Sequence, residues 1–220
     1  VCADHGELHG EHGLYGHEFS LYDPLVNVPL MVRHPDLAAD PAETVELLDL
    51  YHTVLDALDE TGGDPADPGD EAVPLDPERS LLCDEYRSFA EAPDPETPGH
   101  DPGKRGGGDY GFVEYARPVV ELKQLEEKAS AAGIDLDEDS RFYARMRAAR
   151  RPDAKYVRVD RTSDEAFRVD RDPGERENLA GALDDHPGLA ETERALAAFE
   201  AARVGVVCGV PRAADRGLER

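Results

Sequence analysis

Acidic and imidazole side chains gather near the start of the chain, where Asp4 and His5 directly follow a short apolar segment. Residues 1–3 indicate the end of a buried strand, and Gly6 permits a sharp backbone turn beside the pair. Ligands bind at the ends of strands in open α/β sheets. A carboxylate oxygen and an imidazole nitrogen together suit a divalent cation. Asp4 and His5 are therefore the candidate metal ligands.

The loop over residues 4–17 is rich in Gly and His and carries more groups of the same kind. We interpret His9 and His12 as structural residues, and Glu7 and Glu11 as solvated carboxylates. The loop ends at His17, whose ring can donate a hydrogen bond.

The composition is strongly acidic. The chain of 220 residues has 49 acidic and 24 basic residues and a formal net charge of −25, and only four of the basic residues are lysines. This charge argues against a nucleic-acid partner, because a phosphate backbone would be repelled. Such a composition resembles that of haloarchaeal proteins, in which salt screens the repulsion within the compact state. We expect the melting temperature to rise with salt concentration.

Cysteine usage and hydropathy bear on the compartment. The three cysteines, Cys2, Cys83 and Cys208, match neither a disulfide framework nor a zinc-binding spacing, which indicates a reducing compartment. No run reaches the roughly 18 apolar residues of a membrane span. The chain begins at Val1, directly at a motif. We therefore expect a cytoplasmic protein. Export remains the alternative, because a signal could precede this segment.

The periodicity of apolar residues predicts an α/β portion followed by an α+β portion. In the first portion we expect strands over residues 28–33 and 80–86 and a helix over residues 43–60. In the second we expect helices over 119–132 and 139–149, a hairpin of strands over 155–159 and 166–169, a short helix after 175, and a last helix over 188–203. Residues 62–78 and 91–109 are rich in Pro, Gly and Asp and predict loops.

Residues 4–17 resemble the second metal-binding motif of the sulfatases, a family of the alkaline phosphatase superfamily. In that family an Asp-His-Gly segment leads into Leu-Gly-Glu-His-Gly and Trp-Gly-Lys, before an apolar strand that contains Val-Pro-Leu. Here the loop and residues 27–30 have the same layout. Later motifs of the family are resembled, in family order, by residues 48–55, 154–157 and 167–179.

The resemblance implies a domain organisation. Residues 1–90 would form the C-terminal part of the catalytic α/β domain, with an alkaline-phosphatase-like sheet portion. Residues 91–153 would be a Pro/Gly-rich insertion with helices. Residues 154–220 would form a smaller α+β part with an antiparallel hairpin and a terminal helix.

The resemblance also assigns roles to single residues. Asp4 and His5 would bind the active-site divalent cation, which is usually calcium in sulfatases. The substrate would be a sulfate ester of a small molecule or a carbohydrate. His17 stands where sulfatases commonly have a lysine that contacts the sulfate. Because of this difference, a phosphoester is an alternative substrate to the sulfate ester.

The family's nucleophile is a formylglycine, made from the cysteine of a Cys-x-Pro-x-Arg motif. Residues 208–212 approach this motif, but the proline comes one residue late and the segment follows the last expected helix, so we interpret it as coincidence. We expect the formylglycine upstream of this chain, and the chain alone to be inactive. Two alternatives stay open: a phosphodiesterase or phosphonate monoester hydrolase of the same superfamily, and a non-catalytic remnant.

Overall fold

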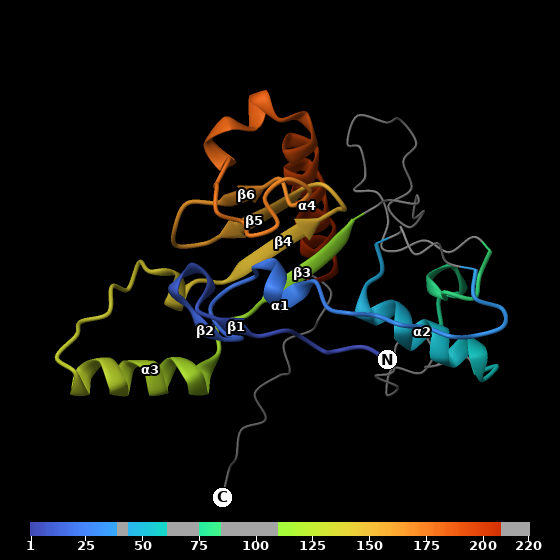
Figure 1. The fold of residues 1–220 in the computed structure, drawn as a ribbon, viewed down its shortest axis with the longest axis horizontal. Helices are drawn as coiled ribbons and strands as arrows, with labels where there is room; N and C mark the ends of the chain where they lie inside the picture. Colours follow the sequence, from blue (N-terminus) through green and yellow to red (C-terminus); the bar gives the residue numbers. More distant parts are fainter. Residues whose placement is uncertain (39–43, 61–74, 85–109, 208–220) are drawn as a thin grey trace, which may run out of the picture.

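A four-stranded antiparallel sheet forms the centre of the structure (Figure 1). The computed structural model describes residues 1–38, 44–60, 75–84 and 110–207. The strands pair in chain order, and their bounds are β3 Gly111–Tyr115, β4 Met146–Arg150, β5 Lys155–Val159 and β6 Glu165–Phe167. Helix α3, Val119–Ala131, lies in the connection between β3 and β4. The fold is therefore mixed α/β, with an antiparallel sheet.

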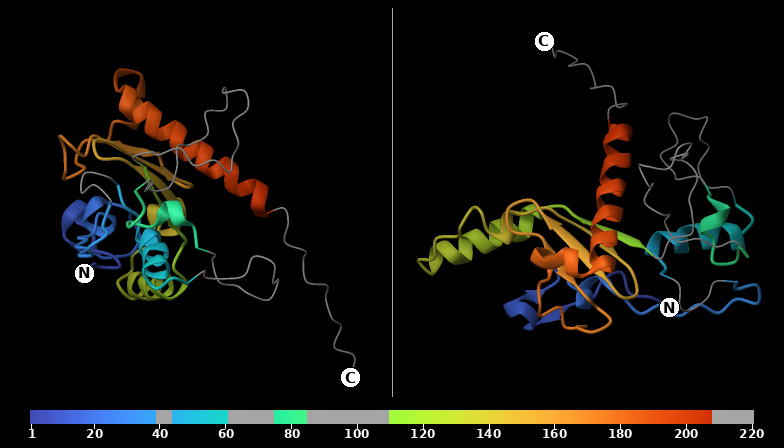
Figure 2. Two further views of the ribbon diagram at one scale, coloured as in Figure 1. Left: turned by 90° about the vertical axis from the view of Figure 1, so that its right-hand side faces the viewer. Right: turned by 90° about the horizontal axis from the view of Figure 1, so that it is seen from above.

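Apolar side chains are buried on both faces of this sheet, because successive residues of a strand point to opposite faces. One face buries Met146 and Val157 together with Leu21 of the N-terminal segment. The other face buries Leu189 and Leu196 of the terminal helix α4, which spans Pro187–Val207. Figure 2 shows α4 on one side of the sheet and the N-terminal segment on the other. The sheet thus carries two packed layers.

The N-terminal segment forms a small hairpin and a short helix. Their bounds are β1 Leu8–His9, β2 Tyr15–Gly16 and α1 Asp23–Val26. The strands pair antiparallel, with Leu8 opposite Gly16. Gly10 and Gly13 turn the chain between them with φ angles of 120° and 73°, a region that glycine enters without steric cost.

Helix α2, Leu47–Ala57, begins at a capping box. Glu46 and Asp49 cap each other's backbone there, which satisfies donors that the first helical turn leaves free. The same two carboxylates bind the buried guanidinium of Arg79, and the Arg79 Nε–Asp49 Oδ1 distance is 2.6 Å. This ion pair ties α2 to the 3-10 helix Pro77–Arg79.

Several predicted elements are confirmed. The helices expected over 43–60, 119–132 and 188–203 correspond to α2, α3 and α4. The expected hairpin is formed by β5 and β6, and the short helix expected after residue 175 is the 3-10 helix Ala180–Asp185. Among the described residues, none of the helices is long and apolar enough to cross a membrane.

The helix predicted over residues 139–149 is wrong. A 3-10 helix covers Arg141–Tyr143, and β4 follows at Met146–Arg150. The Ala and Arg residues of this segment favour helix by intrinsic propensity. In the fold they pair on both sides, with β3 and with β5, and Ala148 and Ala149 are fully buried. Tertiary pairing therefore overrides local propensity.

The strands predicted in the first portion are also wrong as regular elements. Residues 1–3 and 28–33 meet in a single antiparallel bridge, Cys2 with Leu30. Residues 85 and 86 of the strand expected over 80–86 lie outside the described residues; within 80–84 the chain turns instead of extending. Side-chain oxygens bind its backbone there: Leu81 N–H donates to Thr53 Oγ1 at 3.0 Å, and Leu82 N–H to Ser80 Oγ at 3.2 Å. Local polar contacts thus replace a strand ladder.

Candidate metal centre

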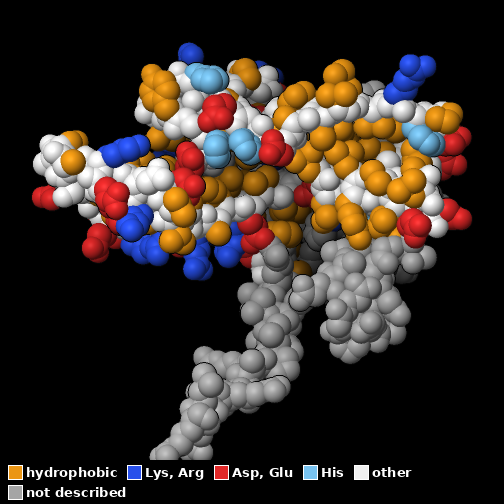
Figure 3. Space-filling model, turned by 90° about the horizontal axis from the view of Figure 1, so that it is seen from below, with side chains coloured by type: hydrophobic (Ala, Val, Ile, Leu, Met, Phe, Trp, Pro, Cys, Tyr) orange, Lys and Arg blue, Asp and Glu red, His pale blue; other side chains and the backbone are white. Residues whose placement is uncertain are grey.

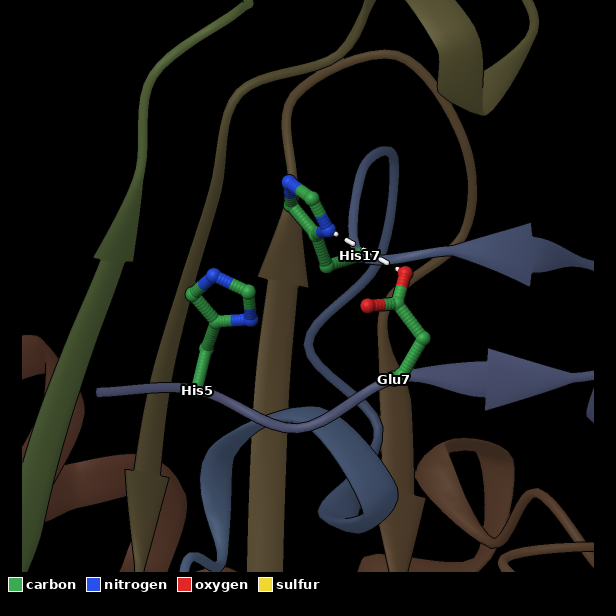
Figure 4. Close-up of side chains that lie close together, drawn as sticks. All are labelled: His5, Glu7 and His17. Atoms are coloured by element: carbon green, nitrogen blue, oxygen red, sulfur yellow. Dashed lines mark hydrogen bonds and ion pairs between the residues drawn. The ribbon is translucent and has the colours of Figure 1, made fainter. Parts of the chain in front are cut away.

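The hairpin β1–β2 brings Glu7 and His17 together. Because Leu8 lies opposite Gly16 in the antiparallel pair, the residue before β1 and the residue after β2 face each other. Leu8 is buried, at 1% exposure, so the strand alternation turns Glu7 outward. His17 Nδ1 lies 3.2 Å from Glu7 Oε1, as Figure 4 shows. Both side chains are about half exposed, at 46% and 44%.

His5 joins this pair from the same strand segment. It lies two residues before Glu7, a spacing that places both side chains on one side of an extended chain. The rings of His5 and His17 have centroids 4.3 Å apart. One ligand atom from each of His5, Glu7 and His17 lies within 4.8 Å of the other two (Figure 4). We call these three residues the His-Glu-His cluster.

Each imidazole of the cluster has a second polar neighbour. His5 Nδ1 lies 2.8 Å from the carbonyl oxygen of Gly6, and this hydrogen bond raises the pKa of His5 above its ordinary value. His17 Nε2 lies 3.5 Å from Glu18 Oε1. In each ring one nitrogen therefore contacts a backbone carbonyl or a carboxylate outside the cluster.

Asp4 lies beside the cluster. Its Oδ1 accepts a hydrogen bond of 3.1 Å from the His5 backbone N–H, and its Oδ2 is 3.9 Å from His5 Nε2. Hydrogen bonds from backbone N–H groups lower the pKa of Asp4, so this carboxylate stays ionised. Its side chain is 90% exposed.

The segment that carries these residues is fixed by close contact with α1. The Gly6 N–H donates to the carbonyl of Leu25 at 2.9 Å. A Cβ on Gly6 would lie 1.8 Å from the carbonyl oxygen of Pro24, so only glycine fits there. The turn expected at Gly6 is thus a close approach between two backbones, and it sets where His5 and Glu7 stand.

Helix α1 is in turn held to the sheet by buried charges. Lys155 of β5 is fully buried, and its Nζ lies 2.9 Å from Asp23 Oδ1 and 2.7 Å from Glu175 Oε1. Although burial acts to raise it, Lys155 and Arg150 hold the pKa of Asp23 below its ordinary value. Burial raises the pKa of Glu175. We call Asp23, Lys155 and Glu175 the buried clamp.

The structure places the other candidate residues outside the cluster. His12 stacks on Tyr22, with ring centroids 3.6 Å apart, and His9 is exposed, with its N–H donating to Glu11 Oε2 at 2.6 Å. Glu7, interpreted from sequence as a solvated carboxylate, instead pairs with His17. Residues 208–212 lie outside the described residues.

The donor set of this region suits a divalent cation. Two imidazole nitrogens with one carboxylate are the donors of many zinc sites. Calcium takes about 6–8 oxygen ligands, and the carboxylates here are those of Asp4, Glu7 and Glu18. On the face drawn in Figure 3, histidine side chains lie against acidic ones, next to a broad apolar area. Because the side chains of His5, Glu7 and His17 are about half exposed, the site is open to solvent.

Comparison with known proteins identifies similar folds but no family by sequence. No family model matches the chain, and no curated protein matches it. A candidate sulfatase from Bacteroides thetaiotaomicron is similar in structure, with a TM-score of 0.55 and 20% identity over 98% of this chain. A 2-O GAG sulfatase is similar over 98% of the chain, with a TM-score of 0.54 and 21% identity.

A phosphonate monoester hydrolase of Agrobacterium radiobacter is also similar, with a TM-score of 0.52 and 21% identity over 91% of the chain. The matched region is 38%, 38% and 34% of these three proteins, so the chain spans little more than a third of each. The fold of this chain is thus that of a portion of these proteins.

Proposed function

We propose that this chain is part of a sulfatase-type hydrolase that cleaves anionic oxyesters with the help of a divalent cation. The observation that carries the proposal is the meeting of His5, Glu7 and His17 next to Asp4 at the exposed end of a hairpin. The fold shared with a candidate sulfatase, a 2-O GAG sulfatase and a phosphonate monoester hydrolase supports it.

In this proposal Asp4 and His5 are ligands of the cation, which the resemblance to sulfatases implies to be calcium. Bound there, the cation would supply charge that offsets the negative ester. His17 would donate a hydrogen bond to an oxygen of the substrate, and the carboxylate of Glu18, 3.5 Å from its Nε2, would orient the ring. The substrate is a sulfate ester of a small molecule or a carbohydrate.

The nucleophile is proposed to come from polypeptide outside these 220 residues. The sequence contains no Cys-x-Pro-x-Arg motif, and the similar proteins are more than twice as long as the matched region. Exposed apolar side chains on α2, which include Leu47, Leu48 and Val54, support a further packing partner. This chain alone is therefore proposed to be inactive.

A phosphonate or phosphate ester is the second candidate substrate. The specific observation in its favour is His17, which stands where the sulfatase motif has a lysine, together with the fold shared with a phosphonate monoester hydrolase. A neutral imidazole donates a hydrogen bond without a full charge, so the two ester classes would be bound differently.

The test begins with the coding sequence immediately upstream of Val1. A Cys-x-Pro-x-Arg motif there favours a formylglycine enzyme, whereas a Thr or Ser nucleophile favours a phosphoesterase. The longer protein is then assayed with 4-nitrophenyl sulfate, 4-nitrophenyl phosphate, bis(4-nitrophenyl) phosphate and 4-nitrophenyl phenylphosphonate. The 220-residue chain is the control, and we expect no turnover from it.

The variant Asp4→Asn should abolish turnover by the longer protein, because it weakens the cation's ligand set. His17→Lys, which restores the residue of the sulfatase motif, should raise the ratio of sulfate to phosphate turnover. No hydrolysis of any of the four esters by the longer protein would contradict the proposal and leave a non-catalytic remnant as the better description.

A further inference from the structure

We infer that the His-Glu-His cluster binds a first-row transition-metal ion of the zinc class, with His5, Glu7 and His17 as its protein ligands. The inference rests on the proposed function only in so far as both use His5. It differs from that function in two respects: the ion is of the zinc class instead of calcium, and Glu7 and His17 are ligands of the ion, so that His17 is not a donor to the substrate.

The distances within the cluster fit such an ion. Donors at about 2.0–2.2 Å from a tetrahedral zinc lie roughly 3.4 Å from one another. His17 Nδ1 and Glu7 Oε1 are already 3.2 Å apart, and all three donors lie within 4.8 Å of one another. Because the side chains of His5 and His17 are about half exposed, small rotations can close the remaining gap.

The groups around the cluster offer each ring an acceptor for its second N–H when an ion is bound. His5 Nδ1 lies 2.8 Å from the Gly6 carbonyl oxygen, which can only accept, so Nδ1 carries the proton and Nε2 keeps a free lone pair. His17 Nδ1 contacts Glu7 at 3.2 Å and its Nε2 lies 3.5 Å from the Glu18 carboxylate. When an ion takes the place of the first contact, the ring can donate its proton to Glu18 and offer Nδ1 to the ion. Metal-binding histidines commonly donate their second N–H to a carbonyl or a carboxylate in this way.

The donor types select the ion. Imidazole nitrogens suit zinc, copper, iron and nickel, whereas magnesium and calcium prefer oxygen ligands. Two of the three donors here are imidazoles. Three protein ligands leave a fourth position for water or substrate, as in catalytic zinc sites. Asp4 Oδ2 lies 3.9 Å from His5 Nε2 and is a further carboxylate beside the cluster.

The experiment is a titration of the 220-residue chain with Zn²⁺ in competition with a chromophoric chelator, and a parallel calorimetric titration with Ca²⁺. We expect one Zn²⁺ per chain, bound more tightly than Ca²⁺. The variants Glu7→Gln and His17→Gln should each weaken zinc binding by more than about tenfold. A tenfold loss is the lower end of the range that follows from changing a residue that only supports a metal ligand.

The matched control is His34→Gln. His34 is also a histidine next to a carboxylate, with its Nδ1 3.8 Å from Asp36 Oδ2, but it is not part of the cluster. This variant should bind zinc like the unmodified chain. Circular dichroism checks that each variant folds, and the exposure of Glu7 and His17 leads us to expect that they do.

Zinc affinity that Glu7→Gln and His17→Gln leave unchanged, or calcium bound more tightly than zinc, would overturn the inference. Its failure is separate from that of the proposed function. Ester hydrolysis that depends on Asp4 but not on Glu7 would refute the inference and keep the function. If the cluster binds zinc but the longer protein hydrolyses none of the esters, the inference stands and the proposed function is refuted.

Discussion

The hairpin over residues 4–18 and the sheet β3–β6 differ in what holds their shape. The sheet buries apolar side chains on both faces, with Ala148, Val157 and Leu196 at 1% exposure or less. In the hairpin Leu8 is the one buried side chain, and the side chains of Glu7 and His17 are about half exposed. The hairpin therefore takes its position from contacts outside itself.

Two contacts transmit the rigidity of the sheet to the site. The buried clamp of Asp23, Lys155 and Glu175 joins α1 to β5, and the close approach of Gly6 joins the segment of the His-Glu-His cluster to α1. The difference between the two regions teaches that a site needs few buried residues of its own, provided that a packed neighbour fixes its backbone.

The largest effect is expected from breaking the buried clamp. Lys155→Met removes the cation that Asp23 and Glu175 share and leaves both carboxylates without it. Loss of one partner of a buried ion pair costs about 3–5 kcal/mol, so the free energy of unfolding should fall by that amount in chemical denaturation. The control is Lys123→Met, since Lys123 and Glu127 form an exposed pair that contributes less than about 1 kcal/mol. Equal effects of the two variants would contradict the clamp's role.

An intermediate effect is expected at the contact between the two regions. Gly6→Ala places a methyl group 1.8 Å from the Pro24 carbonyl oxygen, so the backbone must shift, at a cost of about 1–3 kcal/mol. We expect divalent-ion binding to be lost while the sheet stays folded, measured by ion titration together with near-ultraviolet circular dichroism.

Gly181→Ala is the matched control for that substitution, because a Cβ at Gly181 meets no atom within 4 Å. It should change neither ion binding nor stability appreciably. If Gly6→Ala bound ions as well as Gly181→Ala does, the site would not depend on its contact with α1.

The smallest effect concerns His12, which stacks on Tyr22 at the edge of the hairpin. Burial lowers the pKa of His12 below its ordinary value. A folded pKa below the unfolded one means that this histidine's contribution to stability is present above about pH 6.5. It is lost as the pH falls through the folded pKa. Proton NMR titration should show His12 titrating at lower pH than an unperturbed histidine, and Tyr22→Leu should reduce the difference.

The sequence predicted the elements whose apolar period is unambiguous. Alternation at Tyr156 and Val157 gave β5, and the helical spacing before residue 58 gave α2. The prediction from sequence failed at Ala148 and Ala149, whose helical propensity is overridden by pairing with β3 and β5. It also missed β3, whose signal was the short β-branched and aromatic run Phe112 to Tyr115.

The site was predictable in part. The resemblance to sulfatases indicated Asp4, His5 and His17, and the structure places His5 and His17 side by side. The pairing of Glu7 with His17 was missed because it depends on the register of β1 and β2, which the composition of the loop does not specify. The spacing of two residues between His5 and Glu7 was the available signal.

The most direct test of the metal centre is a crystal of this chain grown with Zn²⁺ and measured on both sides of the zinc absorption edge. We predict an anomalous peak between His5, Glu7 and His17, at about 2.0–2.2 Å from one atom of each. A well-ordered cluster with no peak between those three residues, or with zinc bound only elsewhere on the chain, would contradict the account.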